Sequence, residues 1–454
     1  MRIDSSALLG MACICLSVAC GDSSGPTGGS GGEAGHSAGG AGGDMPVALR
    51  VRGVASGVAG TGVTLTLNET EQLTVTADGD FEFATSFQSG DAFSVVVTSE
   101  PTCPERYCQL TAADGALTDT DATVTLTCAE PRYRLFARGW NFDEDGYIRV
   151  TDDLQSYADG ATATPRFING PTTELTQSGY DGLAYDRERD TLYTTTPGAI
   201  LVFEHASTIE GDIAPSRRIT VPAVDAQGAF YNGNGGLEFD PVLDRLYVTQ
   251  SGGVNHDGLY ILDDVSTLDG LVASPTWIPL NGTFSVTLDP VKDVLYVTFE
   301  GSPYGLYVFD HPATLTSAST PSRTISWPDD FLANASIDTC HDRLYLGSNV
   351  ATLGGHNLFA FDNPGALDGG ISLEAGSVAQ LTTDGGAAFA CGCTAGSIIT
   401  LLDSAGRLYA WPDAADYADL FDHPEAFVGA SSPTPDKRIN GVLHWSFGAV
   451  VSPY

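Results

Sequence analysis

The chain has 454 residues and a formal net charge of −37, because it carries 57 acidic residues and only 20 basic ones. This charge argues against binding to the phosphate backbone of nucleic acids, and an anionic lipid surface would also repel the chain. The 53 glycines and the runs rich in Val, Thr and Ser predict an all-β protein of many short strands and tight turns. The chain is longer than a single hydrophobic core ordinarily accommodates, which indicates several domains or a repeat fold.

The first 20 residues predict an export signal. One basic residue, Arg2, precedes an apolar run from Ala7 to Ala19 that is too short to span a membrane as a helix. The run ends in Leu-Ser-Val-Ala-Cys, which resembles a bacterial lipoprotein signal, where the cysteine is lipidated and becomes the new N-terminus. The resemblance implies lipidation at Cys20. The alternative is an ordinary secretory signal with a chance cysteine.

Residues 21–45 predict a flexible tether. They are almost entirely Gly, Ser, Ala and Thr with scattered acids, so they cannot bury apolar surface. A coil of this length has a mean reach of about 25–30 Å. A lipid at Cys20 followed by such a tether would hold a folded cargo off a membrane. We therefore expect a cell-envelope protein anchored in the outer membrane, facing the periplasm or the exterior.

Residues 46–130 predict a small β-sandwich. Seven short stretches alternate apolar and polar residues, and turn signals such as Asp78-Gly79 separate them. The order of these phrases resembles a small immunoglobulin-like module of bacterial surface lipoproteins. In that module the last two cysteines form a pair, which implies a disulfide between Cys108 and Cys128. Cys103 has no counterpart in the pattern, which leaves it as a candidate free thiol.

Residues 131–454 repeat one phrase about every 50 residues, a period typical of propeller blades. The phrase begins with the apolar end of a strand, continues with an acidic residue or a residue that replaces it, and ends in a turn with a helical pattern. Examples are Val202-Phe-Glu-His and Val308-Phe-Asp-His. Six copies begin at positions 150, 202, 261, 308, 360 and 410. His205 and His311 lie in these turns, and we interpret them as solvated turn residues rather than ligands.

Each unit also contains a predicted hairpin with two aspartates. Gly236-Leu-Glu-Phe-Asp240, for example, is followed four residues later by Asp244 and then by a strand. Because the pair recurs in four units, turn capping explains it better than paired carboxylates for acid–base catalysis. Four strands per unit predict a propeller blade. The unit at 387–417 is degenerate, with residues 388–393 in place of its inner strand and Asp turn.

The first unit lacks an inner strand, which residues 441–450 would supply from the far end of the chain. We therefore predict a small β-sandwich followed by a six-bladed β-propeller closed by its C-terminal strand. The unit phrases resemble the NHL-repeat and lactonase-type propellers as a family. The resemblance covers about 132–454 and implies the fold more than the function.

Three further cysteines, Cys340, Cys391 and Cys393, occupy the same hairpin position in successive units. Cys-x-Cys is a weak zinc signal, and an exported chain favours disulfides. We expect Cys340 to pair with Cys393 or Cys391. Free thiols and a metal site remain as alternatives.

The loops that lead into the inner strands carry acids and amides that would face the mouth of a central channel. Six-bladed gluconolactonase-like and paraoxonase-like enzymes hold calcium at that mouth with such groups, and the metal polarises an ester carbonyl. The resemblance to lactonase-type propellers therefore implies a calcium site. Its candidate ligands are Glu174, Asp181, Asn232, Asn234, Asp330 and Asp384.

The sequence contains no serine-hydrolase elbow, zinc-protease motif, phosphate loop or EF-hand loop, and it identifies no catalytic residue. The hypothesis that we favour is a tethered binding or scaffold lipoprotein for an unidentified protein, glycan or small-molecule partner, with no assured cofactor. The alternative is a calcium-dependent lactonase or esterase with its site at the channel mouth.

Overall fold

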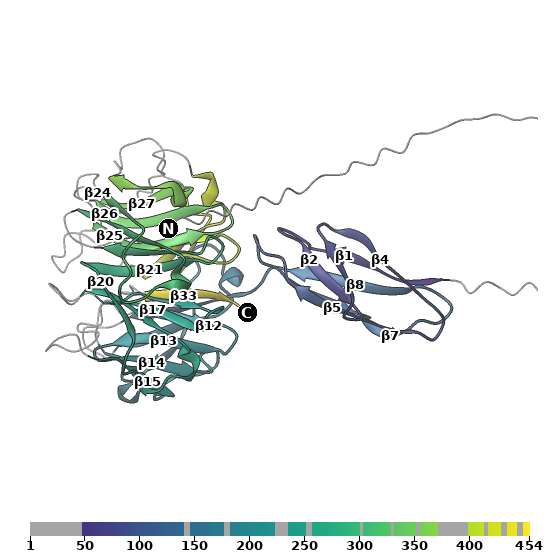
Figure 1. The fold of residues 1–454 in the computed structure, drawn as a ribbon, viewed down its shortest axis with the longest axis horizontal. Helices are drawn as coiled ribbons and strands as arrows, with labels where there is room; N and C mark the ends of the chain where they lie inside the picture. Colours follow the sequence, from purple (N-terminus) through teal and green to yellow (C-terminus); the bar gives the residue numbers. More distant parts are fainter. Residues whose placement is uncertain are drawn as a thin grey trace, which may run out of the picture. The chain divides into compact units, whose positions relative to one another are not determined.

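The structure is a computed structural model, and the residues it describes form an all-β chain with short 3-10 turns, as the composition predicts (Figure 1). No helix in this described part is long and apolar enough to cross a membrane. The expected signal and tether lie outside it. The described ranges are 48–139, 146–176, 182–222, 235–250, 257–299, 303–327, 331–350, 355–370, 398–412, 416–427, 434–442 and 448–454.

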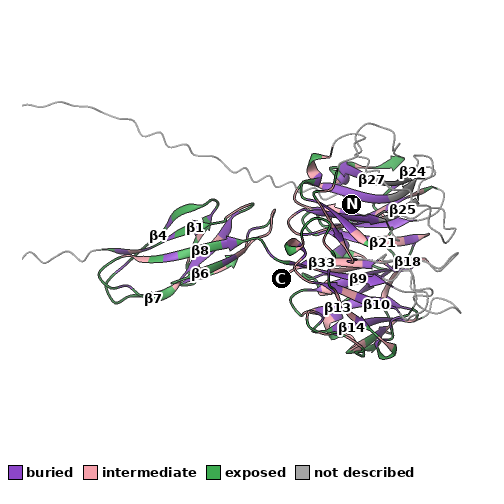
Figure 2. Ribbon diagram, turned by 180° about the vertical axis from the view of Figure 1, so that it is seen from behind, coloured by how far each residue is buried: buried purple, intermediate pink, exposed green. Residues whose placement is uncertain are grey.

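Residues 48–129 form two four-stranded sheets that share one hydrophobic core. The sheet orders are β4-β1-β8-β6 and β3-β2-β5-β7. Buried and less buried side chains alternate along β1, and Val51, Leu65 and Phe83 are fully buried in the shared core (Figure 2). The strands are β1 Leu49–Ser56, β2 Val63–Leu67, β3 Glu71–Val75, β4 Gly79–Phe87, β5 Ala92–Ser99, β6 Tyr107–Thr111, β7 Asp114–Ala116 and β8 Ala122–Ala129.

A disulfide joins Cys108 on β6 to Cys128 on β8, where the two residues stand opposite each other in antiparallel register. The predicted pair is therefore confirmed. The two cysteines are 20 residues apart, and closing a loop of that size stabilises a small domain by about 3 kcal/mol.

The described residues between 133 and 454 form six further sheets. Their orders are β11-β10-β9-β33, β12-β13-β14-β15-β19, β16-β17-β18-β20, β21-β22-β23-β24-β28, β25-β26-β27 and β29-β30-β31-β32. The first three contain β9 Tyr133–Gly139, β10 Tyr147–Thr151, β11 Arg166–Asn169, β33 Gly448–Pro453, β12 Leu183–Asp186, β13 Thr191–Thr196, β14 Ala199–Glu204, β15 Arg217–Thr220, β19 Gly270–Leu271, β16 Leu237–Asp240, β17 Arg245–Gln250, β18 Gly258–Leu262 and β20 Thr276–Pro279. The last three contain β21 Thr283–Asp289, β22 Val294–Phe299, β23 Tyr304–Asp310, β24 Arg323–Trp327, β28 Gly369–Gly370, β25 Phe331–Asp338, β26 Arg343–Val350, β27 Gly355–Asp362, β29 Ile398–Leu402, β30 Leu408–Pro412, β31 Tyr417–Phe421 and β32 Lys437–Asn440.

The first of these sheets takes its fourth strand from the far end of the chain. Strand β33 pairs antiparallel with β9, from Gly448 opposite Arg138 to Pro453 opposite Tyr133 (Figure 2). We expected this strand at 441–450, whereas it begins at Gly448. Residues 443–447 lie outside the described part.

The recurring aspartates cap the hairpins after the first strands of their sheets. The carboxylate of Asp240 accepts hydrogen bonds from the backbone N–H groups of Val242 and Leu243 at 2.9 and 3.1 Å, and Asp289 is bonded in the same way. The second aspartate of each pair has a positive φ, for example 50° at Asp244, a conformation that Asp tolerates better than most residues. These contacts confirm the interpretation as turn capping.

The interpretation of the last unit was wrong. Its Asp-capped turn follows β29, where the Asp403 carboxylate accepts hydrogen bonds from the N–H groups of Ala405 and Arg407. Ala410 lies on β30, and the repeated phrase follows β31 instead, ending in the 3-10 turn Pro424–Ala426. The turn was missed because Gly406, with a φ of 83°, stands where the other units have the second aspartate.

Six basic side chains link each sheet to the next in chain order. Each donates a hydrogen bond to a backbone carbonyl in the turn after the third strand of the following sheet, and the last link returns from the sixth sheet to the first. The links run from Arg166 to Ile209, Arg217 to Leu268, Arg245 to Pro312, Arg323 to Gly365, Arg343 to Glu425 and Lys437 to Gln155.

The acidic residue of the repeated phrase holds the linking cation. Charge-assisted hydrogen bonds of this kind are about twice as strong as neutral ones, so the acid orients the guanidinium for the carbonyl beyond it. The repeated acid therefore has a structural role. The pairs are Arg217 with Glu204, Arg245 with Asp263, Arg323 with Asp310, and Arg343 with Asp362.

Replacing Arg217 by Met is expected to lower the free energy of unfolding by about 1.5–3 kcal/mol, because the carbonyls of Val265 and Leu268 lose a charged donor. Arg218 on the same strand is the matched control, since its side chain is 48% exposed. Arg218→Met is expected to change that free energy by less than about 0.5 kcal/mol. Urea unfolding measures both, and equal effects would contradict the role assigned to Arg217.

Candidate functional site

One cavity is lined by strands from all six sheets of residues 133–454. These strands are β12, β16, β21, β25, β29 and β33, and each is an edge strand of its sheet. The cavity has a volume of about 330 Å³, which falls in the range of small-molecule sites. It is therefore the candidate site.

Glycines at the start of two lining strands allow the close approach of their neighbours. A Cβ atom on Gly182 would lie 2.2 Å from the carbonyl oxygen of Gly235, and one on Gly236 would lie 2.8 Å from the Cα of Ser285. Such distances exclude any larger residue without a shift of the backbone. The recurring glycine before each of these strands thus reflects the packing of strands around the cavity.

Glu238 on β16 is the single acidic or basic side chain among the described residues that line the cavity. Burial raises its pKa to about 8, and the negative charge of Asp240 adds to this effect, while a hydrogen bond from the backbone N–H of Leu288 opposes it. At neutral pH the carboxyl is therefore mostly protonated and presents an O–H donor. Sequence reasoning missed this residue, because the signal was only one acid in a strand position where other units have Ala184, Thr287, Ser336 and Leu401.

Several other polar groups of the lining are already engaged. The Asn334 side-chain amide donates a hydrogen bond to the carbonyl of Thr400 at 2.6 Å, and the Ser336 hydroxyl donates to the same oxygen at 2.9 Å. The hydroxyls of Ser285 and Thr298 lie 3.0 Å apart. Glu238 is therefore the strongest polar group that the cavity offers to a ligand.

One candidate calcium ligand, Glu174, lies in the described part of the structure, so the calcium site stays a prediction. Glu174 is described, and its carboxylate lies 3.3 Å from the Nε of Arg218 beside a separate cavity of about 350 Å³. Among the described residues, no group of three or more His, Cys, Asp or Glu could hold a metal ion. The other five candidates lie outside those residues: Asp181, Asn232, Asn234, Asp330 and Asp384.

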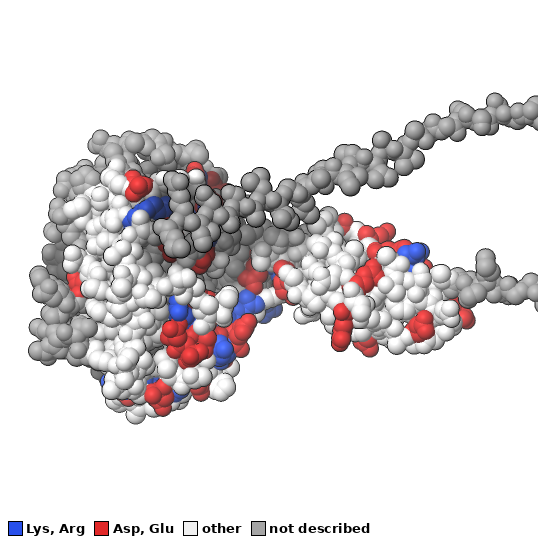
Figure 3. Space-filling model, in the orientation of Figure 1, with Lys and Arg blue, Asp and Glu red and all other residues white. Residues whose placement is uncertain are grey.

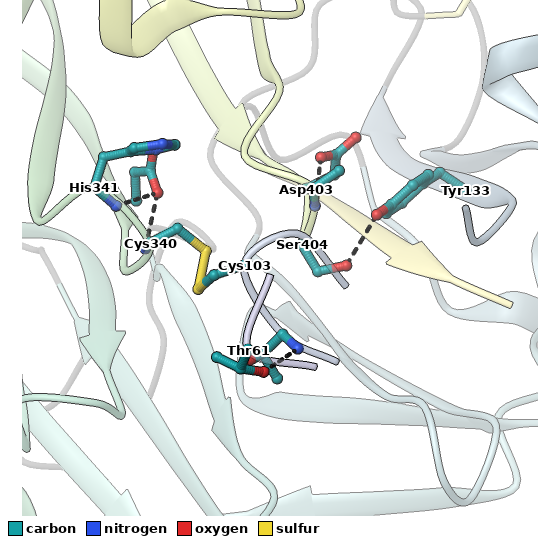
Figure 4. Close-up of a disulfide and its surroundings, with 10 residues drawn as sticks. Thr61, Cys103, Tyr133, Cys340, His341, Asp403 and Ser404 are labelled. Atoms are coloured by element: carbon teal, nitrogen blue, oxygen red, sulfur yellow. Dashed lines mark hydrogen bonds and ion pairs between the residues drawn. A yellow bond between two sulfur atoms is a disulfide. The ribbon is translucent and has the colours of Figure 1, made fainter. Parts of the chain in front are cut away.

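Cys340 forms a disulfide with Cys103, 237 residues away in the sequence (Figure 4). The expected pairing of Cys340 with Cys393 or Cys391 is therefore wrong, because a cysteine can join only one disulfide, and Cys103 is not a free thiol. Cys391 and Cys393 lie outside the described residues. No motif could have identified the pair, since its members belong to unrelated sequence patterns.

Further contacts join the segment around Cys103 to hairpins after the cavity strands. The carboxylate of Glu105 accepts a hydrogen bond from Arg187 at 2.7 Å, and the Glu105 N–H donates to the carbonyl of Ser404 at 3.3 Å. The Arg187 guanidinium also lies 4.7 Å from the centre of the Tyr107 ring. Arg187, Cys340 and Ser404 lie in the hairpins after β12, β25 and β29, so this segment contacts three of the six sheets.

No family model and no curated protein matches the sequence. Among solved structures, the β-propeller domain of Swd1 from Myceliophteria thermophila is similar at 10% identity and a TM-score of 0.36, covering 67% of this chain and 83% of that one. A protein from Bacteroides uniformis assigned as a 6-phosphogluconolactonase has 12% identity and a TM-score of 0.40, and the match covers 71% of this chain and 100% of that one. TolB from Acinetobacter baumannii has 11% identity and a TM-score of 0.38, and the match covers 68% of this chain and 66% of that one. Likeness of this degree carries no conclusion about the activity of this chain.

The raised pKa of Glu238 makes stability depend on pH. Between about pH 4.5 and 8 the folded chain keeps a proton that the unfolded chain has released, so the free energy of unfolding falls as the pH rises. Glu238→Gln is expected to remove this loss. The stability gained by the variant should therefore grow from pH 5 to pH 8, by at most about 1.4 kcal/mol per unit.

Urea unfolding at several pH values measures this difference. Glu188→Gln is the control, because Glu188 is exposed on the hairpin after β12. A gain for Glu238→Gln that is the same at every pH would show that the carboxyl does not titrate in this range.

Proposed function

We propose that the chain is an extracytoplasmic lipoprotein whose six sheets form a closed six-bladed β-propeller that binds a small molecule in its central cavity. The observation that carries the binding proposal is the cavity itself, with one carboxyl group at Glu238 and one edge strand from every sheet. In this proposal the two-sheet part is the immunoglobulin-like module, and the propeller doubles as a scaffold for a protein or glycan partner.

Three features support the six blades and their closure. Strand β33 pairs with β9, so the two ends of residues 133–454 share a sheet. The link from Lys437 to Gln155 completes the series of cation-to-carbonyl contacts. The first and last sheets also share a core, in which Leu135 packs with Trp411 and Leu420.

Binding is favoured over hydrolysis by the chemistry of the cavity. Hydrolysis by a carboxylate pair or by a bound metal needs at least one further acidic ligand or base beside the first. Among the described lining residues, Glu238 is the only carboxyl group, and its raised pKa keeps it mostly protonated at neutral pH. A calcium-dependent lactonase would instead bind one calcium tightly and turn over lactones or aryl esters.

A thermal-shift screen of polar small molecules against the full-length chain tests the binding proposal. Ligands of the cavity should raise the melting temperature of the wild type and of Glu188→Gln, and should lose part of that effect in Glu238→Gln. Turnover of a lactone or aryl-ester panel that depends on stoichiometric calcium would overturn the binding proposal in favour of the hydrolase.

The lipid anchor is tested at Cys20. Cys20→Ser is expected to move the protein from the membrane fraction to the soluble fraction, since the lipid would have no attachment site. Cys15→Ser is the matched control in the same apolar segment and should leave the distribution unchanged. Immunoblots of fractionated cells and mass spectrometry of the mature N-terminus measure the outcome. A membrane-bound Cys20→Ser protein with an N-terminus elsewhere would contradict the anchor.

A further inference from the structure

We propose that the central cavity selects a small organic ammonium ion over anions and neutral molecules of the same shape. This inference deepens the proposed binding function and rests on it. It follows from the charge of the groups around the cavity, from the size of the cavity and from the aromatic side chains in its lining.

The surroundings of the cavity are acidic. Glu238 lines it, and Asp240 and Asp289 are buried at the ends of two lining strands. Among the described residues, these two aspartates are hydrogen-bonded by backbone N–H groups. No Lys, Arg or His lines the cavity in the described part of the chain. An anion entering it would meet repulsion without a basic partner, whereas a cation would be attracted.

The groups on the elements around Glu238 are mostly acidic or phenolic. Its own strand carries Asp240, and the neighbouring β21 carries Asp289. Asp186 on β12 is paired with Arg189 at 2.7 Å in the hairpin beyond the strand. Two phenol residues complete the surroundings: Tyr247 stands opposite Glu238 in the register of β16 and β17, and Tyr193 on β13 stacks on Phe239. The basic residue of β17, Arg245, donates to Asp263 and Pro312 on the link to the next sheet. On the face displayed in Figure 3, Asp and Glu side chains outnumber Lys and Arg side chains.

Size and composition favour an organic cation over a metal ion. Calcium takes six to eight oxygen ligands and usually several carboxylates, but the described lining provides one carboxylate in about 330 Å³. Tyr185 and Phe239 also line the cavity, each one residue before the aspartate that ends its strand. The Tyr185 ring lies 4.8 Å from the Phe136 ring and the Phe239 ring stacks 5.9 Å from the Tyr193 ring. The ring surface that remains toward the cavity would add cation–π attraction for an ammonium group.

Binding of the cation would be linked to a proton. The carboxyl of Glu238 is mostly protonated at neutral pH, and a bound ammonium ion favours its ionised form. Each binding event would therefore release up to one proton below about pH 8. The affinity should rise with pH by up to tenfold per unit and level off above the pKa.

Calorimetric titration of the full-length protein with choline tests the proposal, and 3,3-dimethylbutanol and 3,3-dimethylbutyrate serve as neutral and anionic compounds of similar shape. We expect choline to bind at least tenfold more tightly than either compound at pH 8, and roughly tenfold more tightly at pH 7.5 than at pH 6.5. Glu238→Gln should remove both the preference and the pH dependence, while Glu188→Gln should keep them. Phe239→Leu should weaken the binding of choline more than the binding of the neutral compound. This variant provides a second test if Glu238→Gln folds poorly.

Three results would overturn the ammonium proposal. These are equal affinity for choline and the neutral compound, unchanged choline binding in Glu238→Gln, or no binding of any ammonium ion alongside tight binding of calcium. If a neutral or anionic molecule from the thermal-shift screen bound in the cavity while choline did not, the ammonium proposal would fail and the proposed binding function would stand.

Discussion

The six-sheet part of this protein depends on a charged hydrogen bond from one sheet to a turn of the next. Apolar packing between sheets is not directional, and it would allow neighbouring sheets to slide. A cation such as Arg217, held by Glu204 and donating to the carbonyl of Leu268, sets both distance and angle. The carbonyls it satisfies lie in tight turns, where a buried oxygen without a partner would cost about 1–3 kcal/mol. Six of the 20 basic residues serve this one role in a chain with a net charge of −37.

The cavity is a consequence of the same arrangement. When each sheet is tied to the next at its outer turn, the first strands face one another, and their glycines allow the approach seen at Gly182 and Gly236. Most polar groups there are used by neighbouring strands, as with Asn334 and Thr400. Glu238 accepts a hydrogen bond from the backbone N–H of Leu288 on β21, and its pKa is raised because no basic side chain offsets the effect of burial. A half-buried acid with a raised pKa is a stability cost that a ligand of opposite charge would relieve.

The two disulfides act over very different distances in the sequence. The bond between Cys108 and Cys128 fastens neighbouring strands of one sheet. The bond between Cys103 and Cys340 closes a loop of 237 residues. In the loop-closure model, the lost chain entropy raises the free energy of the unfolded state by about 5 kcal/mol. Glu105 adds contacts with Arg187 and Ser404, so the segment around Cys103 is fastened to hairpins from three sheets.

By itself the sequence determined the all-β class and the Asp-capped hairpins, because these features depend on a few adjacent residues or on one local strand pattern. The pairing of Cys108 with Cys128 came from the resemblance to an immunoglobulin-like module. Tertiary structure decided which residues separated by tens to hundreds of positions meet. Cys103 with Cys340, Arg217 with Leu268 and the isolation of Glu238 in a cavity all depend on how sheets pack together. The last sheet shows where sequence patterns stop being sufficient. Its hairpin has Gly406 where the other hairpins have a second aspartate, so the pattern did not predict a turn that the fold nevertheless forms.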